Sequence, residues 1–294
     1  MVLRTATPAV TGRAWLGFLA GFALLCGVLL GISAIDATGR WGLAILAAVL
    51  LTAVGVEQRR RPARVGAVLR RLGLGRPGGR ALALAAGVSG LVVLVFPVTA
   101  AASGTAVALR PDWPWLLVGV FAFHGLAEEV VWRGVAFRRL RDGRSFPAAT
   151  AWTMPLIAAA HVPIVLALGP AVGIGAMAVA AVTSVPLAYL YETGRNSVWA
   201  PALVHTAIDA FKLVVIPAAA LPTFLVLIIV VALTIPLLAL AVPRRLLLPT
   251  TADQQTGSGS GSTAAPPAET SIMSAGSPGS PRRPRRAARR GRAR

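Results

Sequence analysis

Two adjacent carboxylates and an arginine lie inside one apolar stretch, residues 121–137. An ionisable side chain at membrane depth costs about 3 kcal/mol or more, so it marks a candidate functional site. Glu129 and Arg133 are four residues apart with the acid first, which is the favourable order for an ion pair on one helix face. Glu128 is rotated by about 100° from Glu129 and has no obvious local partner. We therefore expect Glu129 and Arg133 to form a structural pair and Glu128 to act as a general base.

Two histidines and a second acid follow on later apolar segments. His161 precedes Pro163, which removes a backbone donor and should kink the helix beside the histidine. His205 and Asp209 are four residues apart, so they share one face of their helix. Counted at about 1.5 Å per residue, His161 lies somewhat deeper than Glu128, His205 and Asp209, and the four can still converge between the midplane and the cytoplasmic face.

The elements that position these groups are membrane helices. Of 294 residues, 56% are hydrophobic and only 13% are charged, whereas a soluble domain carries about 25% charged residues. A span needs about 20 helical residues. We predict an all-α polytopic membrane protein of about eight transmembrane helices, with a four-helix catalytic core over residues 115–219. Seven spans are the alternative, because the second apolar run is short. The apolar runs are 14–35, 41–56, 81–109, 115–137, 147–168, 171–190, 198–219 and 221–243.

The arginines predict the orientation. The net charge of +19 is concentrated in arginine blocks at 57–80, 133–144 and 244–245 and near the C-terminus, a pattern typical of the positive-inside rule rather than of nucleic-acid binding. With eight spans these blocks fall on one side and only Arg40 and Arg110 on the other. We expect a multi-pass protein of the cell membrane with both termini cytoplasmic and no nucleic-acid partner.

The chain divides into two parts by composition. Residues 1–245 hold the apolar runs and form the predicted transmembrane domain. Residues 246–294 are rich in Gly, Ser, Ala and Pro and end in an arginine cluster, so they should form a disordered basic cytoplasmic tail. Such a tail either lies against anionic lipid headgroups or is a solvated segment that enforces orientation.

The motifs resemble a known family. Glu128-Glu129-Val-Val-Trp-Arg133, Ile157-Ala-Ala-Ala-His161 and His205-Thr-Ala-Ile-Asp209 occur in the order found in the CPBP family. These are the CAAX-type and bacteriocin-processing intramembrane proteases, also called Abi proteins. The resemblance covers residues 121–211 and rests on three motifs, each in its own apolar run.

The resemblance implies roles for these residues. Glu128 would activate a water for attack on a peptide carbonyl, and His161 would help to orient or polarise it. His205 and Asp209 would stabilise the oxyanion, while Glu129 and Arg133 would maintain the site.

Two positions depart from the family pattern. Ile157 replaces the usual Phe of the second motif, which changes the shape of the pocket. Asp209 stands where Asn is common, and an ionised Asp cannot donate a hydrogen bond. Asp209 would then be protonated, hold His205 as a cationic donor, or pair with Lys212.

Other functions and a metal remain as alternatives. A non-catalytic scaffold or immunity protein could retain the fold, but this chain keeps every acid and imidazole. A transporter usually shows repeated halves, which we do not find. We expect no cofactor, the alternative being zinc held by Glu128, His161 and His205. The expected substrate is a membrane-anchored protein or peptide. Because the composition is typical of a GC-rich bacterial genome, a prenylated CAAX protein is not expected.

Overall fold

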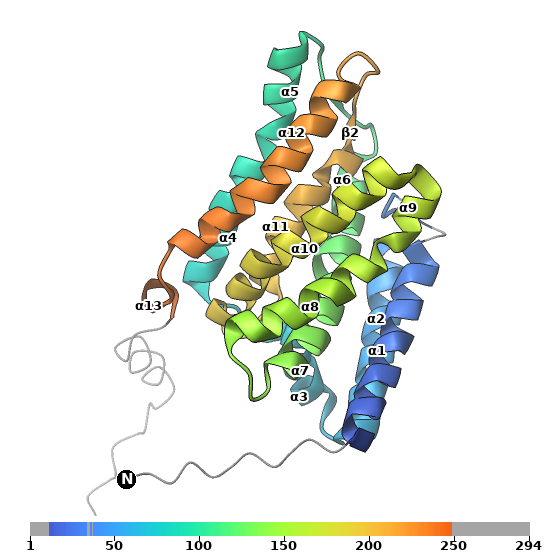
Figure 1. The fold of residues 1–294 in the computed structure, drawn as a ribbon, viewed down its shortest axis with the longest axis vertical. Coiled ribbons are helices and arrows are strands. Elements are labelled where there is room, and N and C mark those ends of the chain that lie inside the picture. Colours follow the sequence, from blue (N-terminus) through green and yellow to red (C-terminus); the bar gives the residue numbers. More distant parts are fainter. Residues whose placement is uncertain (1–11, 34–35, 37, 249–294) are drawn as a thin grey trace, which may run out of the picture. The chain divides into compact units, whose positions relative to one another are not determined.

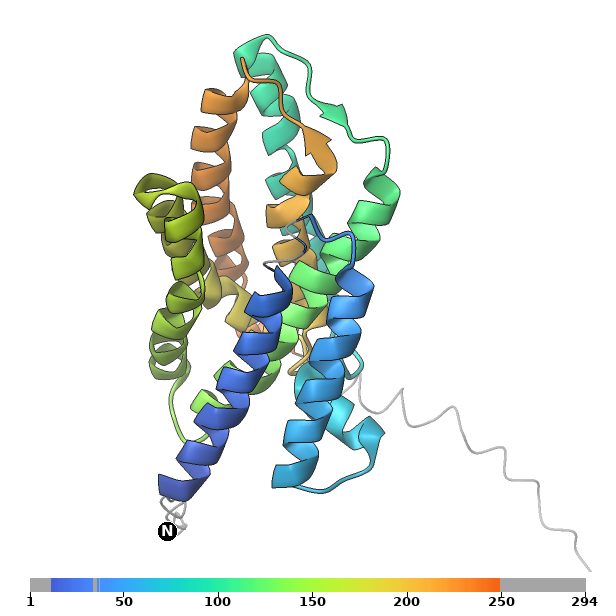
Figure 2. The ribbon, with the colours of Figure 1, turned by 90° about the vertical axis from the view of Figure 1, so that its right-hand side faces the viewer.

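The computed structural model describes residues 12–33, 36 and 38–248, which form a bundle of helices (Figures 1 and 2). The predicted tail lies outside the described residues from 249 onward. The elements in chain order are α1 Gly12–Ser33, α2 Gly42–Arg60, α3 Val65–Leu69, η1 Arg70–Leu74, α4 Gly79–Val93, α5 Val95–Ser103, β1 Ala108–Leu109, α6 Trp113–Val120, η2 Phe121–Ala127, η3 Val130–Phe137, α7 Arg138–Arg141, α8 Phe146–Ala160, α9 Val162–Leu168, α10 Pro170–Thr193, α11 Trp199–Ile208, η4 Asp209–Leu213, β2 Val214–Val215, α12 Leu221–Thr234, η5 Ile235–Ala241 and α13 Arg244–Leu247.

The all-α polytopic membrane fold is confirmed. Each of the eight predicted apolar runs contains a helix. Among the described residues, six helical segments are long and apolar enough to cross a membrane: Gly42–Arg60, Gly79–Ser103, Trp113–Arg141, Phe146–Leu168, Pro170–Thr193 and Leu221–Ala241. The first run gives a shorter apolar helix, Trp15–Gly31, and the seventh gives only α11 and η4.

The arginine blocks gather at one end of the bundle. The C-terminal end of α2 and the short helices α3, α7 and α13 lie towards the lower end of Figure 1. We call this the arginine-rich end. Arg40 and Arg110, the two arginines expected opposite, share one carboxylate, Asp112, at 2.8 and 3.2 Å.

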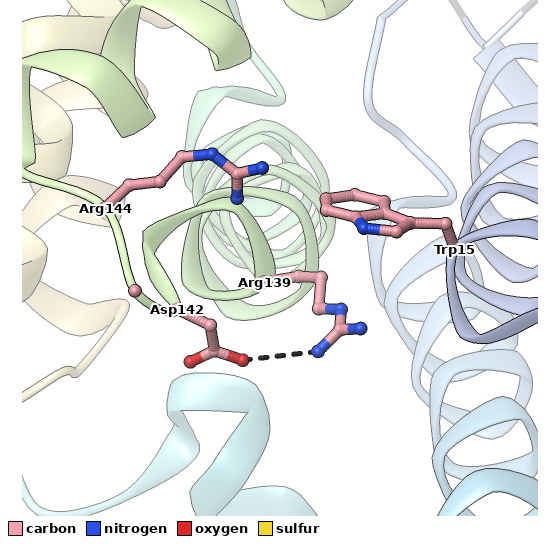
Figure 3. Close-up of a pocket in the computed structure, with 5 residues that line it drawn as sticks. Trp15, Arg139, Asp142 and Arg144 are labelled. Atoms are coloured by element: carbon pink, nitrogen blue, oxygen red, sulfur yellow. Dashed lines mark hydrogen bonds and ion pairs between the residues drawn. The ribbon is translucent and has the colours of Figure 1, made fainter. Parts of the chain in front are cut away.

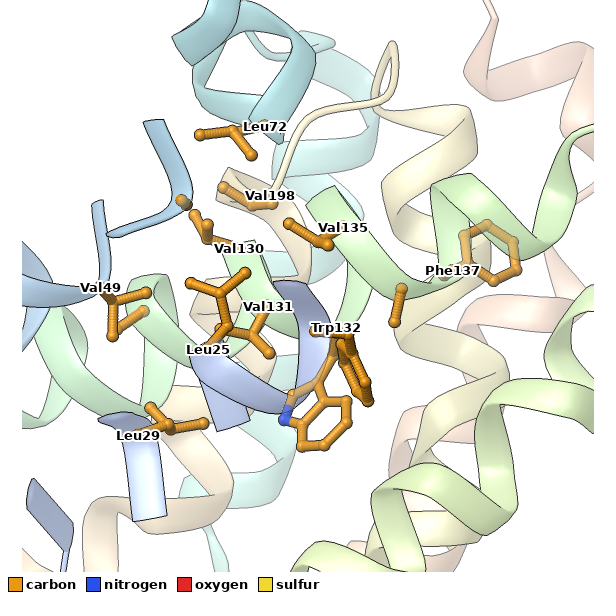
Figure 4. Packing of buried hydrophobic residues seen from close by; sticks show 14 of the residues in the cluster. Leu25, Leu29, Val49, Leu72, Val130, Val131, Trp132, Val135, Phe137 and Val198 are labelled. Carbon is orange, nitrogen blue, oxygen red and sulfur yellow. The ribbon is translucent and has the colours of Figure 1, made fainter. Parts of the chain in front are cut away.

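The segment that carries the acids is the most buried part of the bundle. Val130, Val131 and Trp132 follow Glu129 directly and are 0–2% exposed. They pack with Leu25 of α1, Val49 of α2, and residues of α10 and η1 in the main apolar cluster (Figure 4). The other spans expose much of their apolar surface, as lipid-facing helices do. The acids are therefore surrounded by other helices rather than by lipid.

A glycine sets the distance between the two helices that carry most of the candidate site. A Cβ on Gly125 of η2 would lie 2.6 Å from Oγ1 of Thr206 and 3.1 Å from the carbonyl of Ala202, both on α11. The first contact is shorter than real Cβ atoms show, and the second is tighter than most real Cβ contacts. Gly125 thus lets α11 approach η2 closely, one turn before Glu128 and Glu129.

A small sheet ties the same two helices together at the end opposite the arginines. β1 and β2 pair antiparallel, with Ala108 opposite Val215 and Leu109 opposite Val214. The backbone N–H of Arg110 also donates to the carbonyl of Leu213 at 2.9 Å. The residues just before α6 and just after η4 are therefore held in fixed register.

Candidate active site

Glu128 and Glu129 lie between two π-helical stretches, η2 and η3. A π-turn widens the helix and occurs frequently at functional sites. The whole segment from Ala122 to Phe137 is buried except Glu128, which is partly accessible. Of the two acids, Glu128 is therefore the one that a substrate or water can reach.

The predicted pair between Glu129 and Arg133 is present. Arg133 donates to Oε1 of Glu129 at 2.8 Å, and their side chains are 3% and 0% exposed. Oε2 of Glu129 and Nε of Arg133 are buried without hydrogen-bond partners among the described residues. A buried charge must be paired to be tolerated, so each of the two ions depends on the other.

Glu128 does have a local partner, contrary to the expectation from the sequence. Nδ1 of His124, one turn earlier, lies 2.7 Å from its Oε1. Nε2 of His124 in turn lies 2.5 Å from Nζ of Lys212, in η4. A lysine ammonium can only donate, so Nε2 accepts and Nδ1–H donates to Glu128. His124 thus connects the two helices and fixes one oxygen of the acid.

His205 joins the two carboxylates of the first motif. Its Nδ1 lies 2.7 Å from Oε1 of Glu129, so Glu129 holds both Arg133 and this imidazole. Its Nε2 faces Oε2 of Glu128 at 3.7 Å and Oδ2 of Asp209 at 3.5 Å. Because Glu129 takes the Nδ1–H, Nε2 is the ring nitrogen directed at the other two acids.

Asp209 contacts two of its predicted partners. Besides His205, its carboxylate lies 3.9 Å from Nζ of Lys212. Both distances exceed a hydrogen bond, so these are ion-pair contacts. Lys212 therefore lies between Asp209 and His124, and it links the third motif to the partner of Glu128.

His161 is the site residue that the structure holds least closely. It caps the junction of α8 and α9, and α9 begins with Val162 and Pro163, so the predicted kink is present. Its Nδ1 lies 2.8 Å from the carbonyl of Ile157 in its own helix. Within the described ranges it makes no hydrogen bond or ion pair to Glu128, His205 or Asp209. Ile157 itself is buried in the main cluster.

A metal site would require Glu128, His161 and His205 to gather around one point. Among the described residues no three His, Cys, Asp or Glu side chains gather in a way that could hold a metal ion. Glu128 is hydrogen-bonded to His124, and the Nδ1 of His205 is bonded to Glu129. As placed, Glu128, His161 and His205 do not fit a metal, and we assign no step to one.

Most of this site lies within one family match. A family model described as "Type II CAAX prenyl endopeptidase Rce1-like" matches residues 110–211. Residues 110–211 are therefore similar to the Rce1-like family. This confirms the resemblance drawn from the three motifs. No curated protein and no solved structure matches the chain. The Rce1-like stretch contains all six residues identified from the sequence and also His124, while Lys212 lies one residue beyond it.

Sequence reasoning missed the roles of two residues. The four-residue spacing of His124 and Glu128 was a readable signal for a side-chain contact within one helix. His124 belongs to none of the three motifs, so the sequence predicts only a structural or pocket-lining role for it. The contact from Lys212 to His124 joins two helices distant in the sequence, and no residue spacing within a single helix indicates it.

Proposed function

We propose that this chain is an intramembrane endopeptidase that hydrolyses a peptide bond by glutamate-activated water. The arrangement of Glu128 carries the proposal. One of its oxygens is held by His124 at 2.7 Å, and the other faces Nε2 of His205 at 3.7 Å. A general base needs a fixed, accessible carboxylate oxygen next to the reacting group, and oxyanion stabilisation needs a donor close by.

In the proposed reaction, Glu128 takes a proton from a water as the water oxygen adds to the peptide carbonyl carbon. The carbonyl oxygen becomes an oxyanion, which accepts a hydrogen bond from Nε2–H of protonated His205. Collapse of the tetrahedral intermediate breaks the C–N bond, and Glu128 returns the proton to the leaving amine. The products are a carboxylic acid and an amine, which become a carboxylate and an ammonium once the acid proton passes to the amine, so protons and electrons balance.

The remaining residues support these two groups. Glu129 orients His205 through Nδ1, and Arg133 compensates the charge of Glu129. Asp209 favours the cationic form of His205 by its contact at 3.5 Å, which supports the second of the three roles considered for an acid at this position. His161, at the kink between α8 and α9, would orient the water or substrate once a substrate is bound.

The substrate class follows from the setting of the site. Glu128, Glu129 and His161 lie on segments long enough to cross a membrane, so the substrate is a membrane-anchored protein or peptide. The prenyl CAAX specificity in the description of the matching family is a property of that family, and we do not assign it to this chain. We propose that no metal takes part, and activity that survives chelation would support this.

The experiment is a comparison of membrane peptides from cells that express the wild-type chain or Glu128→Gln. The amide keeps the shape of the side chain and an oxygen that accepts from His124, but it cannot take a proton. We expect cleavage products to disappear while expression and thermal stability are retained. Identical peptides in both samples would refute the protease and favour the non-catalytic scaffold.

We propose that the arginine-rich end faces the cytoplasm, as the positive-inside rule requires. Reporter tags after Arg80, after Gly143 and after the last residue should report the cytoplasm, and a tag near Pro111 the outside. Tags at Arg80 and Pro111 on the same side would refute this topology.

A further inference from the structure

A cavity of about 450 Å³ opens at the arginine-rich end, away from the candidate active site. Its walls come from η1, from the end of η3 and α7, from the end of α10 and from the loop before α11. The lining residues are Arg70, Arg71, Phe137, Arg138, Arg141, Asp142, Tyr191, Glu192, Arg195 and Asn196.

The cavity carries five guanidinium groups and two carboxylates, a net charge of +3. Both carboxylates are already engaged. Glu192 pairs with Arg141 at 2.5 Å and with Arg244 at 2.6 Å. Asp142 pairs with Arg139, outside the cavity, at 3.4 Å.

Three of the arginines have no acidic partner. The side chains of Arg70 and Arg195 make no hydrogen bond or ion pair with any described residue. Arg71 has only a long contact, 3.5 Å, to the backbone carbonyl of Arg61. Positive charge concentrated in a concave site attracts anions more strongly than the same charge spread over a surface.

Two further features indicate a site shaped for a ligand. Arg195 and Asn196 are the only described non-glycine residues with positive φ, at 70° and 54°. Backbone conformations of this kind cost free energy and cluster at ligand clamps and active sites. The hydroxyl of Tyr191, on the cavity wall, is buried and has no hydrogen-bond partner among the described residues.

We propose that this cavity binds a phosphate group, supplied by the headgroup of a membrane lipid. Guanidinium groups match phosphate oxygens in two-point hydrogen bonds, and Arg is the residue that best provides them. The lipid source follows from position, because two of the candidate spans end at Arg141 and Thr193, beside the cavity. The inference does not depend on the proposed hydrolysis.

The neighbouring cavity of about 300 Å³ is less suited to an anion (Figure 3). Its two arginines, Arg139 and Arg144, lie 5.4 and 5.3 Å from the ring of Trp15. Asp142 also neutralises Arg139 there. The charges in this smaller cavity are therefore already engaged.

The test uses the purified full chain in detergent micelles, titrated with short-chain phosphatidylglycerol and followed by its thermal unfolding. Arg70→Gln/Arg195→Gln removes the two unpaired cavity arginines. Arg59→Gln/Arg76→Gln is the matched control, because it removes the same charge from exposed positions outside the cavity. A general attraction to anionic lipid weakens by about fivefold for each arginine lost, equally in both variants.

We expect phosphatidylglycerol to stabilise the wild-type chain and the control variant, and the cavity variant to bind it at least about tenfold more weakly than the control. A second outcome is that inorganic phosphate at matched concentration stabilises the wild type but not the cavity variant. That result would show that the cavity binds phosphate and that the ligand is a free anion, not a lipid headgroup. Equal lipid affinity of the two double variants would overturn the proposal. The altered arginines are exposed, so we expect both double variants to fold. The unfolding temperature of each variant without lipid reports any fold defect. If the cavity variant has one, Arg195→Gln alone replaces it.

Discussion

Replacement of Glu129 by Gln separates the two acids of the first motif by their effect on stability. In the wild type, Oε1 of Glu129 neutralises Arg133 at 2.8 Å, and both side chains are almost fully buried. Glu129→Gln leaves the guanidinium buried beside a neutral amide. Removal of one partner of a buried pair costs about 3–5 kcal/mol, a large share of a typical folding free energy of about 5–15 kcal/mol. Glu128→Gln costs about 0.5–1.5 kcal/mol, the scale of one weakened hydrogen bond, because Glu128 is partly accessible.

The measurement is the free energy of unfolding in mixed micelles at increasing denaturant, together with the yield of folded protein. We expect Glu129→Gln to be less stable than Glu128→Gln by about 1.5–4.5 kcal/mol, from the difference of the two costs above. A double variant, Glu129→Gln with Arg133→Met, should recover part of the loss because no guanidinium remains buried without its partner. Equal stability of the two single variants, or additive losses in the double variant, would refute the assignment of Glu129 and Arg133 as a mutually dependent pair.

Three further outcomes are expected. Asp209→Asn should keep much of the activity, while Asp209→Ala should lose about 10²–10³-fold in rate on a cleaved reporter, the scale of an oxyanion-hole group; full activity of the alanine variant would exclude Asp209 from the site. His124→Phe should slow turnover by about 10–100-fold, the scale of a hydrogen bond to a charged group, with an unchanged wild-type fold by circular dichroism; an unchanged rate would show that Glu128 does not need this contact. Burial raises the pKa of Asp36, but four hydrogen bonds within its own loop outweigh this and hold the pKa below its usual value. The ionised Asp36 therefore stabilises the fold at neutral pH, and this stabilisation is lost as the pH falls through the lowered pKa. Asp36→Asn should lower the unfolding temperature at pH 7 and not in acid. An equal decrease at both pH values would contradict this.

The parts of the site that could be predicted from the sequence are those set by one helix. The Glu129–Arg133 pair depends only on four-residue spacing, and the kink at His161 depends only on Pro163. The bond between Glu129 and His205 joins two helices, and its geometry depends on the close approach that Gly125 allows. The motifs indicated which residues converge, but the distances between them are a property of the packed bundle.

The fold shows the same division. Apolar runs predicted helices, because a backbone that crosses lipid has no water to bond and must satisfy its hydrogen bonds internally. The hydropathy pattern did not predict the π-helical turns around the acids or the short strand pair. Strands of two residues carry too little alternation to be recognised. The arginine cavity depends on four separate segments, each of which indicates by itself only a charged loop.

The pairing of β1 with β2 also bears on when the chain acquires a complete site. The two strands lie on either side of the Rce1-like stretch, so their pairing closes a long loop and must await the synthesis of Val215. Before that point the helix with Glu128 is already made, but α11 has no fixed register against it. Long-range pairings of this kind form late, because the entropy of loop closure is spent before the contact can stabilise the chain. A nascent chain would therefore carry Glu128 and Glu129 through membrane insertion without an assembled site, and the site would be completed only after β2 has been made.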